Sequence, residues 1–162
     1  MHAYDSLSTF PDVEPGLQIL QSDTNLSAYV FSNGTEAMVS SSVNSSPSLS
    51  PHSHIFKSLI TVDVMEPPVF KPDPRVYQHL VQSVGKEGPG GDVWLVSGNP
   101  FDVVGARAAG IQAAWVDRTG KGWTDRLGSI IGGAAAEGPT IVVDGVEGAV
   151  MGIKKWVEKN VR

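Results

Sequence analysis

Short, uninterrupted apolar runs alternate along this chain with segments whose apolar residues recur at helical spacing. A strand that is buried on both faces is apolar throughout, whereas a surface helix carries a single apolar stripe. The predicted strands are residues 28–31, 59–62, 92–96, 113–116 and 140–143, and the predicted helices are 13–21, 74–84, 101–109 and one that begins at Val146. This alternation favours an α/β fold, a Rossmann-like three-layer sandwich whose mainly parallel sheet is covered on both faces.

Local signals mark the helix ends and the connections between elements. Asp12 is expected to cap the first helix, and Gly110 stands where a left-handed residue usually closes a helix. Residues 40–53 hold eight serines and two prolines without a charged side chain, which predicts a flexible loop. Residues 86–91 are predicted to form a tight polar connector.

Composition limits the classes of function. With 162 residues the chain fits one domain with a sizeable core, and the absence of Cys excludes a disulfide scaffold, a thiolate metal site and a Cys nucleophile. A net charge of −5 argues against nucleic acid as a partner. No apolar run approaches the about 20 residues that a membrane-spanning helix needs, and the first residues do not resemble a signal peptide. A cytoplasmic, enzyme-like domain without a membrane partner is therefore expected.

Polar side chains follow several of the predicted strands. In open parallel sheets, ligands bind at the carboxyl ends of the strands, so these side chains are candidate site residues. The residues that follow the strands are Ser32, Asn33 and Gly34, then Asp63, then Ser97, Gly98, Asn99, Phe101 and Asp102, and finally Asp144 and Gly145. Lys71 precedes the helix predicted at 74–84. Taken one at a time, each has a structural explanation as a turn residue, a helix cap or a surface lysine, and Tyr77 has one as a core aromatic.

The order and spacing of these groups resemble the haloacid dehalogenase superfamily, and most closely the L-2-haloacid dehalogenases. Residues 29–38 resemble that family's second motif, residues 70–77 its third, and residues 96–123 its fourth motif with the strand beyond it. Residues 60–63 follow the family pattern too. Each motif alone is weak, but three in the family order are specific. The resemblance extends from about Tyr4 to the C-terminus.

This resemblance implies that a carbon–halogen bond is hydrolysed in two steps. An aspartate at the end of the family's first strand attacks the substrate carbon and displaces halide, and water then hydrolyses the ester. Lys71 would hold that carboxylate ionised, because a nearby cation favours the charged form. Asp102 would pair with Lys71 and help to place the water, while Ser97 and Asn99 would form hydrogen bonds within the same cluster.

The resemblance also implies a class of substrate. Ser32 and Asn33 would bind the substrate carboxylate and help to position the halide. Phe101 would line an apolar pocket, and Tyr77 would lie on the halide side of the site. The implied ligands are small 2-haloacids or related small carboxylic acids. No cofactor and no metal are implied, and a homodimer is the assembly that the family suggests.

Gly98 departs from both branches of this superfamily. The phosphatase members carry an acidic residue there which, with a later aspartate, binds Mg²⁺ through hard oxygen ligands. The dehalogenases usually carry a second serine. Glycine offers no ligand atom and leaves only Asp102, so a Mg²⁺-dependent phosphatase is the less favoured alternative and a metal-independent hydrolase is expected.

The family's first motif, a strand ending in Asp-x-x-x-Thr, is absent from this sequence, as is most of the helical cap. Residues 1–11 resemble the end of that cap, so residues 1–162 are interpreted as an N-terminally truncated core domain that is inactive as this chain alone. Asp144 matches the missing motif only superficially, and Asp63 matches a family position that is not the nucleophile. A non-catalytic binding or assembly remnant of the same fold is the alternative hypothesis.

The missing strand is the central one of the family's sheet. Its loss would leave N–H and C=O groups unpaired along residues 28–31 and 92–96. Three outcomes follow: these two strands pair directly, another chain fills the gap, or the chain is only marginally stable.

Overall fold

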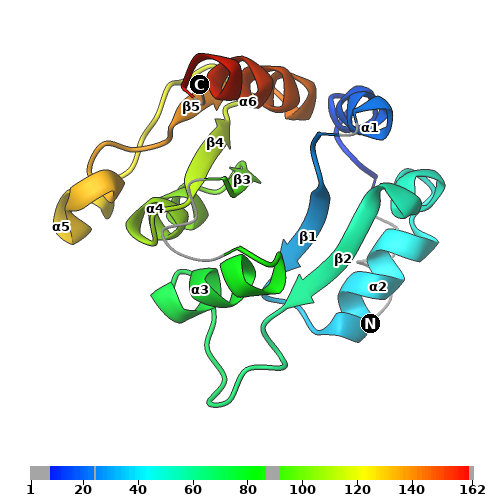
Figure 1. The fold of residues 1–162 in the computed structure, drawn as a ribbon, viewed down its shortest axis with the longest axis horizontal. Coiled ribbons are helices and arrows are strands. Elements are labelled where there is room, and N and C mark those ends of the chain that lie inside the picture. Colours follow the sequence, from blue (N-terminus) through cyan, green and yellow to red (C-terminus); the bar gives the residue numbers. More distant parts are fainter. Residues whose placement is uncertain (1–7, 24, 87–91, 161–162) are drawn as a thin grey trace. The chain divides into compact units, whose positions relative to one another are not determined.

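The computed structural model describes residues 8–23, 25–86 and 92–160, and Figure 1 shows their helices and strands. The chain divides into two compact units, Met1–Val69 and Phe70–Arg162, and each has its own sheet. Every strand pair is parallel, which confirms the predicted α/β class. A single domain over residues 1–162 stays a prediction. Residues 87–91 of the predicted connector lie outside the described residues.

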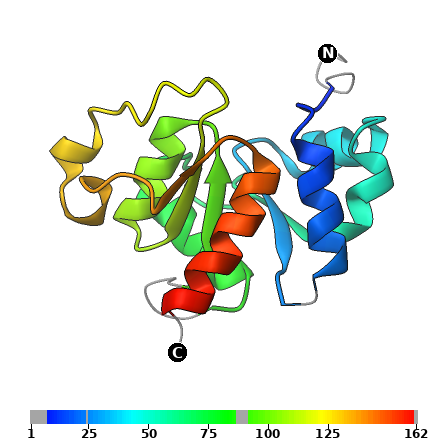
Figure 2. The same cartoon turned by 90° about the horizontal axis from the view of Figure 1, so that it is seen from above.

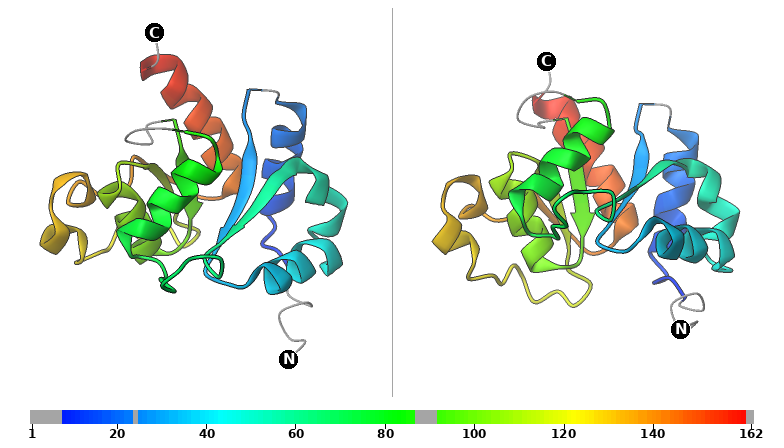
Figure 3. Two further views of the ribbon diagram at one scale, coloured as in Figure 1. Left: turned by 60° about the horizontal axis from the view of Figure 1, so that its bottom comes forward. Right: turned by 90° about the horizontal axis from the view of Figure 1, so that it is seen from below.

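The first unit is built on two parallel strands, β1 (Ala28–Ser32) and β2 (Phe56–Thr61), with Ser32 opposite Thr61 in the register. Its helices are α1 (Val13–Ser22), α2 (Glu36–Ser45) and the 3₁₀ helix η2 (Ser50–Ile55). Figure 3 shows β1 and β2 side by side and α2 packed along β2. The residues of β1 are half-buried rather than buried, since β2 is its partner in a sheet of two strands.

The flexible loop predicted at residues 40–53 is wrong, because α2 and η2 occupy this segment. Thr35 begins α2 by accepting a hydrogen bond at its Oγ1 from the Met38 N–H, at 3.3 Å. Val39 and Val43 lie one turn apart and are buried. Two buried valines and a cap therefore stabilise this helix. Its serine content led to the prediction of a loop, but tertiary packing commonly outweighs intrinsic helix propensity.

The expected cap at Asp12 is also wrong. The residue precedes α1, but its side chain makes no capping hydrogen bond and its backbone is already helical, with φ −77° and ψ −13°. A capping side chain reaches the free N–H groups of the first turn from an extended backbone, which Asp12 does not have.

The second unit contains the parallel strands β3 (Trp94–Ser97), β4 (Gln112–Val116) and β5 (Ile141–Val143), with β4 in the middle. Its helices are α3 (Pro74–Ser83), α4 (Pro100–Ala108), α5 (Gly128–Ile131), the 3₁₀ helix η3 (Gly133–Ala135) and α6 (Val146–Asn160). Figure 2 shows α6 across one side of this sheet and α4 on the other. The predicted strands and helices are therefore confirmed here, with ends that differ by no more than about three residues, as is usual for helix and strand limits.

Each face of this sheet has its own aromatic contact. On the α4 side, Trp115 packs with Val103 and meets Trp123 edge to face, with 5.0 Å between ring centroids. Trp94 meets Trp156 of α6 in the same way at 5.2 Å. Alternate residues of a strand face opposite sides, so Ser97 shares the side of Leu95 and, through the register, of Trp115. The fold thus directs Ser97 toward α4.

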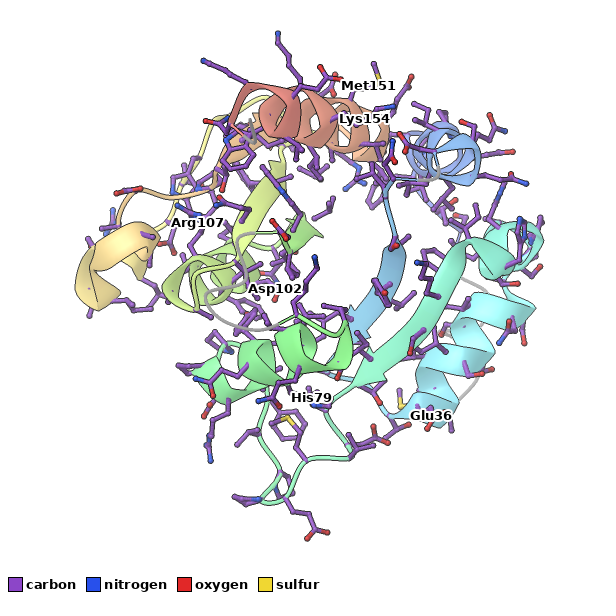
Figure 4. The ribbon with its side chains drawn as sticks, viewed as in Figure 1. Glu36, His79, Asp102, Arg107, Met151 and Lys154 are labelled. Carbon is purple, nitrogen blue, oxygen red and sulfur yellow. The ribbon has the colours of Figure 1, made fainter. Side chains whose placement is uncertain are left out.

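Residues 128–135 form α5 and η3, which the sequence patterns did not predict. Arg107, labelled in Figure 4, connects the segment after η3 to the sheet. Its Nε donates to the Gly138 carbonyl at 3.2 Å, and its Nη1 donates to Gln112 Oε1 at 2.8 Å. None of the helices formed by the described residues is long and apolar enough to span a membrane.

Candidate active site

An ion pair between Lys71 and Asp102 lies at the centre of the candidate site. Lys71 Nζ is 3.3 Å from Asp102 Oδ2, and the two side chains are only 7% and 13% exposed. Lys71 lies just before α3, and Asp102 is in the first turn of α4. Figure 4 labels Asp102 at the start of α4, on the side of that helix that faces α3. The fold therefore joins two motifs that are separated by 31 residues.

Tyr77 donates a hydrogen bond to the same carboxylate. Its Oη is 3.0 Å from Asp102 Oδ1, and its side chain is fully buried. This approach depends on Gly105, one turn further along α4. A Cβ at position 105 would overlap the Tyr77 hydroxyl and lie 2.6 Å from two of its ring carbons. The absence of a side chain at 105 is thus what lets Tyr77 reach Asp102, a requirement that the sequence analysis did not identify.

Ser97 supplies the third hydrogen bond to Asp102. Its Oγ lies 3.3 Å from Asp102 Oδ2 and accepts the Asn99 N–H at 3.0 Å, so the hydroxyl donates to the carboxylate while it accepts from the backbone. Asn99 joins the cluster through this backbone group, and its side chain makes no capping hydrogen bond to α4. Phe101 follows in the first turn of α4 and is 37% exposed.

The electrostatics of the cluster follow from its burial. Removal from water lowers the pKa of Lys71, and the charge of Asp102 opposes that shift. Burial and the neighbouring Asp102 carboxylate both raise the pKa of Tyr77. The phenol therefore stays protonated at neutral pH and remains a hydrogen-bond donor. Asp102 thus accepts hydrogen bonds from Lys71, Tyr77 and Ser97.

The candidate residues of the first unit lie at the end of β1. Ser32 Oγ accepts the Gly34 N–H at 3.0 Å, and Asn33 is exposed. Asp63 Oδ2 accepts the N–H of Glu36 at the start of α2, at 3.1 Å. A hydrogen bond from Thr61 and this backbone N–H lower the pKa of Asp63. Asp63 thus holds the turn that carries Ser32 and Asn33, a role its position in the sequence did not suggest.

Two further positions bear on the chemistry of the strand ends. A Cβ at Gly98 would lie 3.6 Å from Nη1 of Arg118, a residue that the sequence analysis passed over. The carboxylate of Asp144 lies against Gly148 in the first turn of α6. Among residues 8–23, 25–86 and 92–160, no three His, Cys, Asp or Glu side chains are grouped so that they could hold a metal ion.

Comparison with known proteins identifies relatives of this chain. The (S)-2-haloacid dehalogenase 4A of Burkholderia cepacia is 30% identical over 120 residues, covering 74% of this chain and 48% of that protein. The (S)-2-haloacid dehalogenase H-109 of Pseudomonas putida is 34% identical over 127 residues, covering 78% of this chain and 52% of that protein. This chain therefore spans about half the length of the curated relatives it matches.

A solved structure agrees with the fold. The L-2-haloacid dehalogenase of Xanthobacter autotrophicus superposes with a TM-score of 0.71 at 24% identity, covering 99% of this chain and 65% of that one. The family model for haloacid dehalogenase-like hydrolases matches residues 1–110, which is more than half of the sequence. With two curated relatives at 30% and 34% identity, this match shows that the chain belongs to the haloacid dehalogenase-like hydrolase family.

Proposed function

We propose that this chain is part of a hydrolase that cleaves the carbon–halogen bond of small 2-haloacids through an ester formed on an aspartate. The observation that carries the proposal is the buried Lys71–Asp102 pair at 3.3 Å, which holds a cation at the carboxyl edge of the β3–β5 sheet. The names of the relatives, (S)-2-haloacid dehalogenases, support the choice of substrate.

In the proposed first step, a carboxylate oxygen forms a bond to the carbon that bears the halogen, and the halide leaves with the electron pair of the broken bond. Lys71 favours the ionised nucleophile, and Asp102 holds Lys71 in place. Water then adds to the ester carbonyl. The ester bond breaks to give a 2-hydroxy acid and the regenerated carboxylate, and one proton is released with each halide.

The remaining residues are proposed to bind and orient. Ser97 and the backbone of Asn99 fix the Asp102 carboxylate, which would help to place the water. Ser32 and Asn33 would bind the substrate carboxylate, and Phe101 would provide apolar surface around the carbon chain. Tyr77, protonated and buried, is proposed to lie on the halide side. The reaction as proposed needs no metal or cofactor.

The nucleophile is expected in a segment that this sequence does not contain, so we propose that the chain alone releases no halide. The test measures chloride release from 2-chloropropionate by two proteins. One is this chain, and the other is this chain preceded by the half of the Burkholderia cepacia relative that it does not match. We expect release only from the second protein, and loss of that release on Lys71→Met.

The opposite result would refute the assignment. Chloride release by this chain alone, lost on Lys71→Ala, would mean that a residue within it is the nucleophile. A folded but inactive chimera would favour the alternative, a non-catalytic binding or assembly remnant of the same fold. Magnesium-dependent turnover of p-nitrophenyl phosphate would favour a phosphatase, against which Gly98 lacks a ligand atom.

A further inference from the structure

Arg118 lies beside the motif that follows β3. Strands β3 and β4 are parallel, with Ser97 opposite Trp115, so the residues that follow the two strands leave the sheet side by side. Gly98 has no side chain, and the position that its Cβ would occupy is 3.6 Å from Nη1 of Arg118 and 3.6 Å from the Val116 carbonyl oxygen. The guanidinium therefore reaches the backbone between Ser97 and Asn99.

The turn that carries Arg118 is held by the residue before it. Asp117 is 8% exposed, and its Oδ2 accepts the Gly122 N–H at 2.7 Å. Its Oδ1 accepts the hydroxyl and the N–H of Thr119, at 3.0 and 3.2 Å. Burial alone would raise the pKa of Asp117, but these hydrogen bonds outweigh it and the pKa lies below its usual value. Arg118 thus belongs to a turn that is held by the hydrogen bonds of Asp117.

The charges at this edge differ in their exposure. The Lys71 ammonium is buried and balanced by Asp102 at 3.3 Å. Arg118 is exposed and adds a second positive charge where the strands end. A guanidinium presents parallel N–H donors that match the two oxygens of a carboxylate, which an ammonium does not.

We propose that Arg118 binds the carboxylate of the substrate, and that Gly98 leaves the space in which this carboxylate meets the guanidinium. The inference rests on the proposed function for its substrate class, small 2-haloacids. It assigns the charge for carboxylate recognition to the turn after β4. A negative charge at position 98 would then compete with the substrate carboxylate for the guanidinium.

The test measures binding of 2-chloropropionate to this chain by calorimetry, with neutral 2-chloropropionamide and sodium chloride as control ligands. Arg118→Gln removes the charge and keeps most of the length of the side chain. We expect the dissociation constant of Arg118→Gln for the acid to be about tenfold or more above that of the parent. The dissociation constant of Arg118→Lys should lie between those of the parent and Arg118→Gln. Lys121 is exposed on the same turn, and Lys121→Gln removes one positive charge, as Arg118→Gln does. This control variant is expected to bind the acid as the parent does.

A second pair of variants tests the role of position 98. Gly98→Ala and Gly98→Asp both place a Cβ at an ordinary contact distance of 3.6 Å, so both are expected to fold. Gly98→Asp sets an internal carboxylate beside Arg118 and should lose acid binding, whereas Gly98→Ala should keep most of it.

The proposal is overturned if the parent binds the amide as well as the acid, binds neither, or binds the acid no better than Arg118→Gln does. These outcomes are separable from the proposed function. Acid binding that depends on Arg118 would stand even if the chimera released no halide. A chimera that released halide equally well with Arg118→Gln, at the same KM, would keep the function and remove this role.

Discussion

The side chain of Tyr77 fills the space that any side chain at position 105 would need. A Cβ on residue 105 would come within 2.6 Å of two Tyr77 ring carbons, and the Tyr77 hydroxyl lies 3.0 Å from Asp102. Helices α3 and α4 therefore meet through a glycine on one and an aromatic residue on the other.

Gly105→Ala is expected to destabilise the chain although alanine is the better helix former. Overpacking a buried contact costs about 1–3 kcal/mol, against a gain of about 1 kcal/mol in helix propensity. Urea unfolding of the parent and variant measures the difference. Gly98→Ala, where a Cβ has ordinary contacts, is the matched control. Equal stability of Gly105→Ala and the parent would show that Tyr77 moves aside without cost.

Lys71→Met is expected to lower the free energy of unfolding more than a typical surface substitution. The change leaves Asp102 charged and 13% exposed, and breaking a buried ion pair on one side costs about 3–5 kcal/mol. The double variant Lys71→Met with Asp102→Asn should recover most of the loss, because no unpaired charge remains. Denaturant unfolding of the parent, Lys71→Met, Asp102→Asn and the double variant completes the double-mutant cycle. A double variant that is no better than Lys71→Met would contradict this account.

Tyr77 makes the stability sensitive to alkaline pH. Its pKa is raised in the folded chain, so the unfolded state loses the phenolic proton first, near the ordinary value of about 10. The contribution of Tyr77 to the free energy of unfolding is thus fully present below about pH 10, and it is lost as the pH rises above that value. We measure the free energy of unfolding in urea at about pH 8, 10 and 11. Between the lowest and the highest pH, this free energy should fall less for Tyr77→Phe than for the parent. Tyr29→Phe is the control, and an identical fall in Tyr77→Phe would reject the assignment.

Thr35→Ala is expected to weaken α2. The threonine accepts the Met38 N–H at 3.3 Å, and loss of such a cap costs about 1 kcal/mol. Thermal or urea unfolding followed by circular dichroism measures it, with the exposed Thr124→Ala as a control for the lost methyl and hydroxyl groups. If Thr35→Ala lowered the stability no more than Thr124→Ala does, the buried valines alone would stabilise the helix.

Part of the site could be predicted because the family's motifs are local in sequence. Lys71 and Tyr77 are six residues apart on one segment, and Ser97 and Asp102 are five apart on another. The resemblance implied a Lys71–Asp102 pair, and the structure contains it at 3.3 Å. Arg118 could not be found in this way, because its place beside Gly98 depends on the register of β3 and β4.

The sequence by itself determined the alternation of strands and helices, the parallel α/β class and the order of the motifs, since apolar periodicity and short-range spacing are written along the chain. Only the tertiary structure decided that the serine-rich segment forms α2, that Gly105 admits Tyr77, and that Asp63 holds the start of α2. These features depend on contacts between residues that are distant in sequence. Packing fixes such contacts, and neither residue type nor spacing records them.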